Sequence, residues 1–371
     1  MGAKVAIERC SAYEPDKLDA ALKKTAQASD FPNVTGKTVL LKPNIVMDSA
    51  PEKAVTTHHV FLEAVIRLVK ERGASHVLVG DSPGIQGPNF TASGCGIGEA
   101  AKRCGAEWID FTRGTIDLKC PEGKIQKSFT VSKVLQSVDL VISLPKLKNH
   151  QLMYYTGAMK NLFGLVPSIK KSAFHVRYPS RESFASMIVD LNVAVKPAYA
   201  FMDAVVAMEG PGPSAGTPKK VGLVLASSNL LAMDIAASAI VGYPPQLIPV
   251  TREALARKIW LNDFSEIEYP LLKPEEVTVQ DFVRIPFKKT GNQLLDFITP
   301  RPLKRLIASK NPIPVIDHNA CVCCADCVKI CASNAIKQAE QNGTMRILID
   351  KNKCIRCYCC HEVCSEKAIK I

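Results

Sequence analysis

Residues 37–44 read KTVLLKPN, a short apolar run that passes directly into a basic and polar segment. Further apolar runs end in the same way, at residues 76–80, 139–144, 198–202 and 221–226. Because these runs are continuously apolar instead of alternating, they predict strands buried on both faces of a sheet. Longer amphipathic stretches between them predict helices over residues 57–72, 98–104, 180–195 and 230–240. Strands that alternate with helices indicate an α/β fold with a mostly parallel sheet and helices on both faces.

The composition is that of a globular protein with more than one domain. The chain has 371 residues, of which 47% are apolar and 22% charged, and these values exclude disordered and fibrous classes. The opening MGAKVAIERC lacks the apolar region of a signal peptide, so we expect a cytoplasmic protein. The apolar stretch 221–242 contains Asp234, which disfavours a bilayer, so no transmembrane segment is expected. The net charge of +12 comes without zinc-finger spacing or an uninterrupted basic run, so nucleic acid is not an expected partner.

Cysteine is concentrated near the end of the sequence, in a segment that repeats. Ten of the 14 cysteines lie in residues 321–371. The segment 313–371 repeats with an offset of 33 residues, so that Ile316-Asp317 returns as Ile349-Asp350 and Ala335-Ile336 as Ala368-Ile369. A fixed offset predicts two copies of one structural unit that face each other.

Each copy contains the spacing C-x2-C-x2-C-x3-C, which is typical of iron–sulfur binding. Three thiolates at i, i+3 and i+6 surround one cluster, and the fourth, a turn later, points toward the other. We therefore expect two [4Fe–4S] clusters, one held by Cys321, Cys324, Cys327 and Cys364, the other by Cys354, Cys357, Cys360 and Cys331. A structural zinc site normally has two pairs of ligands separated by a longer gap. Two copies of the cysteine motif in register do not have that spacing and therefore disfavour zinc. Cys323 and Cys359 occupy non-equivalent places in the two copies and are expected to be buried side chains instead of ligands.

The cysteine-rich segment resembles the bacterial two-[4Fe–4S] ferredoxins over its full length, although Ala332 and Ser365 replace the proline that usually follows the fourth cysteine. The resemblance implies a small α+β ferredoxin-like domain at residues 313–371. We expect an α/β domain over residues 1–285 and, between the two, a basic linker over residues 286–312 that contains Pro300 and Pro302.

Polar residues follow the predicted strands of the α/β part at the point where each strand ends. The carboxyl ends of parallel strands meet at one edge of a sheet, where ligands bind in open α/β folds. The lysines among these residues favour an anionic ligand, such as a carboxylate or a phosphate. The residues expected to bind it are Lys42, Asn44, Asp81, Ser82, Lys146, Lys148 and Lys160. The candidates for catalysis are Lys148, His150, Lys160 and Asp203. Neither a G-x-G-x-x-G nor a Walker A sequence supports dinucleotide or nucleoside triphosphate binding.

Several longer strings carry a family resemblance. They are LLKPNIV (40–46), AVTTHH (54–59), GDSPG (80–84), LPKLKNHQLMYYTGAMKNLFGLVP (144–167) and MDAVVAMEGPGP (202–213). These strings resemble the domain of unknown function family numbered 362 over about residues 38–240. The resemblance implies an iron–sulfur protein of anaerobic bacteria and archaea, and it supplies no reaction.

The sequence leaves more than one functional hypothesis open. The leading hypothesis is an electron-transfer protein that exchanges single electrons with a redox partner protein. The alternative is a redox enzyme in which the α/β part binds a small anionic substrate and the ferredoxin-like part supplies electrons. A further hypothesis is a metal or organic cofactor at His150, Lys160 and His175, whose order resembles the set of lactate-racemase-type proteins. A hypothesis from a third class of protein, neither carrier nor enzyme, is a binding module in which the iron–sulfur clusters only stabilise the structure.

Overall fold

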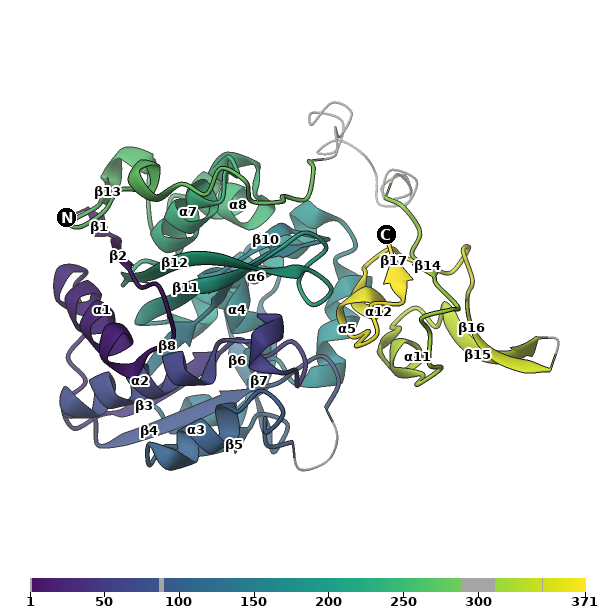
Figure 1. Ribbon diagram of the computed structural model, residues 1–371, viewed down its shortest axis with the longest axis horizontal. Coiled ribbons are helices and arrows are strands. Elements are labelled where there is room, and N and C mark those ends of the chain that lie inside the picture. The colour runs from purple at the N-terminus through teal and green to yellow at the C-terminus, as the bar shows by residue number, and fades with distance from the viewer. Residues whose placement is uncertain (1, 87–89, 288–310, 342) are drawn as a thin grey trace.

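A mostly parallel sheet organises the larger part of the protein (Figure 1). The computed structural model describes residues 2–86, 90–287, 311–341 and 343–371. Along the main path of the sheet the strand order is β10 (Tyr154–Thr156), β9 (Lys146–His150), β11 (Tyr199–Glu209), β8 (Leu140–Leu144), β3 (Thr38–Pro43), β4 (His76–Asp81) and β5 (Glu107–Asp110). Strand β12 (Thr217–Ser227) pairs with β11 and with β2 (Ala6–Arg9). The pairs β3–β4, β3–β8, β4–β5, β8–β11 and β9–β11 are parallel.

Helices cover both faces of this sheet, as the sequence predicts. Alternate residues of β3 enter different cores: Val39 and Leu41 belong to one hydrophobic cluster and Leu40 to the other. The cluster of Val39 contains residues of α1 (Pro15–Ala28), α2 (His59–Glu71) and α3 (Ile97–Arg103). The cluster of Leu40 contains residues of α6 (Arg181–Val195), α7 (Leu230–Ile240) and α8 (Pro249–Arg257). A strand that buries both faces needs no polar residue within it, which explains the continuous apolar runs.

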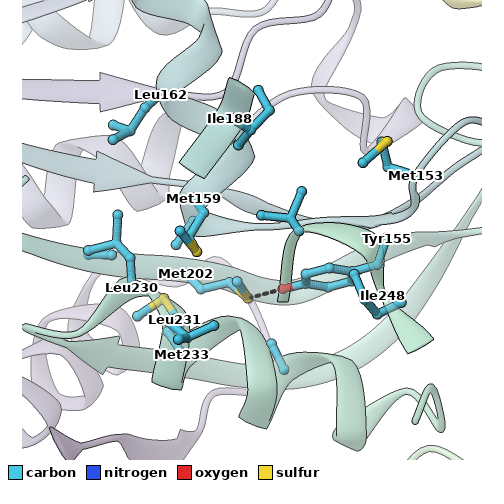
Figure 2. Packing of buried hydrophobic residues seen from close by; sticks show 14 of the residues in the cluster. Met153, Tyr155, Met159, Leu162, Ile188, Met202, Leu230, Leu231, Met233 and Ile248 are labelled. Carbon is cyan, nitrogen blue, oxygen red and sulfur yellow. Dashed lines mark hydrogen bonds between the residues drawn. The ribbon is translucent and has the colours of Figure 1, made fainter. Parts of the chain in front are cut away.

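Figure 2 shows the packing in the second cluster, where Met159, Met202 and Met233 meet Leu230 and Leu231. The hydroxyl of Tyr155 lies 4.0 Å from the Met202 sulfur and 3.2 Å from Asp234 Oδ1. Asp234 also accepts hydrogen bonds from the backbone N–H groups of Ala158 (2.6 Å) and Met159 (3.0 Å). This buried carboxylate therefore holds the first turn of α4 (Ala158–Asn161), the element that carries Lys160.

Two strand predictions need correction. The run 221–226 belongs to β12, which is antiparallel to β11 because a short loop returns the chain directly beside it. Residues 146–150, expected to follow the end of a strand, form the buried strand β9. Strands β8 and β9 both lie along β11, on either side of Pro145. Proline has no N–H to donate, which divides what would otherwise be one strand.

The repeat in the cysteine-rich segment appears as paired strands related by the same offset. Strand β14 (Val315–Ile316) pairs with β17 (Ile369–Lys370), and β15 (Ile336–Gln341) pairs with β16 (Thr344–Ile349). Ile316 faces Ile369 and Ile349 faces Ile336, so each copy donates an equivalent strand to the other. Residues with left-handed backbone recur 33 positions apart, as Cys323 and Arg356, Ala325 and Tyr358, and Asn334 and Lys367. The two copies thus share one backbone conformation.

The predicted linker, residues 286–312, lies largely outside the described residues. Within the described part of the chain, no helix is long and apolar enough to cross a membrane.

Candidate functional site

A cavity of about 90 Å³ lies between the carboxyl edge of the sheet and the cysteine-rich segment. Its walls come from β3, β4, β9, α4, α5 (Ser168–Arg177) and, from the cysteine-rich segment, α12 (Cys359–Glu362), which lies beside α5 in Figure 1. The polar residues in its lining are Lys42, Asn44, Asp81, Ser82, Lys148, Thr156, Lys160, Asn161, Lys171, Ser172, His175 and Glu362. Six of the seven residues predicted to bind an anion therefore share this cavity, and Lys146 does not.

Lys42 and Asp81 form a buried ion pair at the floor of the cavity. Their side chains are 1% and 2% exposed, and Lys42 Nζ lies 2.8 Å from Asp81 Oδ1. Lys42 also donates to the carbonyl of Pro43 (2.6 Å) and to Asn161 Oδ1 (3.1 Å), which occupies all three of its donors. Burial lowers the pKa of Lys42, and Asp81 opposes that shift. Lys42 therefore stabilises the structure of the site and has no hydrogen-bond donor left for a ligand.

The other three lysines of the cavity make fewer hydrogen bonds than Lys42 does. Lys148 Nζ donates to the carbonyl of Val55 (2.6 Å), and Lys171 Nζ donates to the carbonyl of Ser82. Lys160 has neither a hydrogen bond nor an ion pair with any residue that the structure describes. Burial lowers the pKa of Lys160, and the nearby Glu362 carboxylate raises it. Burial also lowers the pKa of Lys148 well below its usual value and that of Lys171 to about 7.

The two histidines proposed beside Lys160 differ in position. His175 lines the cavity and stacks on Phe184 with ring centroids 4.4 Å apart. Burial lowers the pKa of His175 to about 3, so its ring is neutral. His150 lies outside the lining, and its Nδ1 accepts hydrogen bonds from the backbone N–H groups of Leu152 and Met153. Its Nε2 lies 3.2 Å from Glu362 Oε1, without the orientation of a hydrogen bond.

Lys146 and Asp203 form a second buried ion pair, away from the cavity. Lys146 Nζ lies 2.9 Å from Asp203 Oδ2 and 2.7 Å from the hydroxyl of Tyr13. Asp203 also accepts hydrogen bonds from the Tyr13 hydroxyl (2.8 Å) and from the backbone N–H of His58 (2.9 Å). The two residues are direct neighbours in the β9–β11 pair, so they satisfy each other. The structure thus separates them from the other candidates.

The cysteines of the two motifs line two further cavities. Cys321, Cys324, Cys327 and Cys364 line one, and Cys331, Cys354, Cys357 and Cys360 line the other. Each set joins three cysteines of one motif to the fourth of the other. The backbone N–H of Ala335 donates to Cys331 Sγ (3.2 Å) and that of Ala368 to Cys364 Sγ (3.3 Å), which suits a thiolate at each fourth position.

These sets fit the donor requirement of a four-iron cluster, where each thiolate binds a different iron. Within the described residues, no three His, Cys, Asp or Glu side chains converge on a point that could hold a single metal ion. A four-iron cluster does not need such convergence, because its four thiolates surround a cube. The ligand sets themselves stay a prediction.

The cysteine-rich segment contributes residues that the sequence did not suggest for this site. Glu362 and Val363 line the cavity that also contains Lys42, Lys148, Lys160 and Lys171, which we call the lysine cavity. Cys359 lines both the lysine cavity and the cavity of Cys331, Cys354, Cys357 and Cys360. His361 links the cysteine-rich segment to the rest of the protein, because its Nε2 lies 3.0 Å from the carbonyl oxygen of Pro211. Lys171 was also missed, since the pair Lys170-Lys171 resembles an ordinary exposed helix face in the sequence.

Comparison with known proteins agrees with the family resemblance. Residues 39–239 match the family model described as "Domain of unknown function (DUF362)". The chain is 30% identical over 305 residues to the thylakoid-associated protein sll1697 of Synechocystis sp., a match that covers 81% of this chain and 92% of that protein.

Two solved structures are similar at lower levels. The lactate racemase apoprotein of Thermoanaerobacterium thermosaccharolyticum matches with a TM-score of 0.43 and 11% identity, over 62% of this chain and 54% of that one. A Thermotoga maritima protein matches with a TM-score of 0.38 and 12% identity, over 68% of this chain and 61% of that one. The chain thus spans little more than half of each solved structure.

Proposed function

The chain belongs to the DUF362 family, and we propose that this member is an iron–sulfur electron-transfer protein whose α/β part binds an anionic ligand beside its cysteine-rich segment. The observation that carries the proposal is that each of two cavities is lined by three cysteines of one motif and the fourth cysteine of the other, with Cys359 as a further lining residue of one cavity. Residues 313–371 would hold two [4Fe–4S] clusters, one in each cavity. When bound, such clusters supply one-electron transfer.

The position of the cysteine-rich segment supports a joint role for the two parts. Cys359 forms wall for both the lysine cavity and one cysteine cavity, so only a small part of the chain separates the two sites. The other cysteine set includes Cys324, which is exposed. Exposure on that side supports exchange of electrons with a separate redox partner protein.

The first experiment measures what the cysteines bind. Anaerobic reconstitution of the full chain should give about eight iron and eight sulfide per chain, with paramagnetic resonance signals of two interacting clusters after reduction. Cys331→Ser should diminish the cluster assigned to Cys354, Cys357 and Cys360, while Cys323→Ser leaves the iron content unchanged. Zinc in place of iron, or full iron content in Cys331→Ser, would refute the ligand assignment.

A redox enzyme acting on a small anion is the second candidate, favoured by the direct contact between α12 and the lysine cavity. The two candidates differ in the effect of Lys160→Met. For a carrier, electron transfer to an artificial acceptor stays normal in the variant and no small anion is consumed. For an enzyme, a reduced sample converts an added anion, and Lys160→Met abolishes the conversion while the iron content is retained.

A further inference from the structure

The lysine cavity carries more positive than negative groups. Its titratable lining comprises Lys42, Lys148, Lys160 and Lys171 against Asp81 and Glu362, while His175 is neutral. The Lys42–Asp81 pair balances internally, which leaves three lysines facing one carboxylate. When the lysines are protonated, the surplus of two positive charges has no counter-ion among the described lining residues.

We propose that this cavity binds a small dianion, through the ammonium groups of Lys148, Lys160 and Lys171. The inference deepens the anion site of the proposed function and does not depend on the clusters. Lys148 is almost fully buried, and Lys160 and Lys171 are half-buried. A cation removed from water is unfavourable unless it is paired. A dianion would pair both uncompensated charges, whereas a monoanion would leave one of them unpaired.

Hydrogen-bonding capacity in the cavity matches such a ligand. An ammonium group has three donors: Lys160 uses none of them on described residues, and Lys148 and Lys171 each make one hydrogen bond. Asn44 Oδ1 is buried and has no hydrogen-bond partner among the described residues, while its Nδ2 donates to Asn161 Oδ1 (3.2 Å). Several charge-assisted donors and one acceptor therefore remain for the ligand or for water bound with it.

The cavity volume limits the size of the dianion. A water molecule needs about 10–15 Å³ of cavity volume. A cavity of about 90 Å³ therefore has room for roughly six to nine groups the size of a water molecule. Inorganic phosphate and short dicarboxylates such as malonate fall within this limit, and nucleotides exceed it. Phosphate and dicarboxylate share the required charge, so they form the two arms of the test.

Burial lowers the pKa of Lys148, Lys160 and Lys171, so their ammonium forms are disfavoured unless an anion lies beside them. Burial lowers the pKa of Lys171 to about 7, where Lys42 and Lys160 act against its charge and Asp81 and Glu362 support it. A dianion beside the ammonium groups would raise these pKa values, because opposite charge favours the charged form. Binding should therefore be accompanied by proton uptake near neutral pH.

The test is calorimetric titration of the full, iron-loaded chain at constant ionic strength with inorganic phosphate, malonate and acetate. The matched variants are Lys160→Met, inside the cavity, and Lys170→Met, which removes an exposed lysine of the same region. We expect phosphate or malonate to bind, acetate to bind at least tenfold more weakly, and Lys160→Met to weaken the dianion by about tenfold or more. Lys170→Met should bind as the unchanged chain does.

Equal affinity for acetate and malonate, equal loss in both lysine variants, or no binding of either dianion would overturn the inference. The iron content of the same samples distinguishes a failure of the dianion proposal from a failure of the proposed iron–sulfur function. Normal iron without dianion binding would refute the dianion site alone. Dianion binding by a sample that takes up zinc instead of iron would support the site and refute the cluster assignment.

Discussion

Replacing Asp81 by asparagine should destabilise the protein by about 3–5 kcal/mol, the usual cost of removing one partner of a buried ion pair. Lys42 and Asp81 are almost fully buried and their charged atoms lie 2.8 Å apart. The carboxylate also accepts hydrogen bonds from the backbone N–H groups of Ile45 (2.6 Å) and Ser82 (2.8 Å). An asparagine keeps one acceptor oxygen, so one of these donors or Lys42 would face an N–H₂ group.

The assay is urea unfolding of the full chain followed by far-ultraviolet circular dichroism under anaerobic conditions. Asp30→Asn is the matched control, because Asp30 pairs with Lys4 at 3.0 Å while both side chains are well exposed. That control should cost clearly less than Asp81→Asn, because solvent screens an exposed ion pair. The double variant Lys42→Met, Asp81→Asn should cost less than the sum of its single changes, because it removes both charges. An Asp81→Asn cost no larger than that of Asp30→Asn would refute the view that this pair braces the site.

Three more predictions concern the same region. Burial raises the pKa of Asp234 to about 7, above its value in the unfolded chain, so its stabilising contribution is complete below pH 4 and is lost as the pH rises through about 7. The urea midpoint of the unchanged chain should therefore fall relative to that of Asp234→Asn between pH 4 and 8. Midpoints that change in parallel would contradict this prediction. Binding of malonate should weaken from pH 6 to pH 8 as Lys171 loses its proton, and the dependence should flatten in Lys171→Met when both are titrated by calorimetry. Gly164→Ala should cost about 1–3 kcal/mol in the urea assay, because the added methyl group would overlap Asp81 Oδ1 and the end of Lys42; an unchanged midpoint would show that the pair can shift at no cost.

Much of the α/β fold could be predicted because its strands bury both faces. The predicted helices lie within about two residues of α2, α3, α6 and α7, and the apolar runs mark β3, β4, β8, β11 and β12. The antiparallel return of β12 and the continuation of β8 into β9 were not predicted. Both depend on pairing between distant segments, which the periodicity of a single segment does not encode.

The grouping of several candidate side chains around one cavity was also predictable, whereas their role in binding stays a prediction. Lys42, Asn44, Asp81 and Ser82 meet because the parallel strands β3 and β4 end at one edge of the sheet. Lys148, within β9, and Lys160, on α4, reach the same cavity from elements that the strand-end argument does not cover. Lys146 and Asp203 were grouped with them from sequence position alone, but their side chains pair with each other in the sheet. Glu362 comes from a segment distant in the sequence, and a contact between distant segments leaves no local pattern in either one.

The paired repeat has a consequence for the history of the cysteine-rich segment. Positions 33 apart share one backbone yet meet different surroundings: Tyr358 is buried against the larger part, whereas its counterpart Ala325 is half-buried. Glu362 faces the lysine cavity, and its counterpart Lys329 is exposed and pairs with Asp326 at the surface. A duplication yields interchangeable halves, and that equivalence ends here because the second half supplies Cys359, Glu362 and Val363 to the cavity while the first half supplies Ile330. The side chains differ at the attached face, so exchanging the two halves within the segment would keep its internal pairing and lose its fit to the cavity.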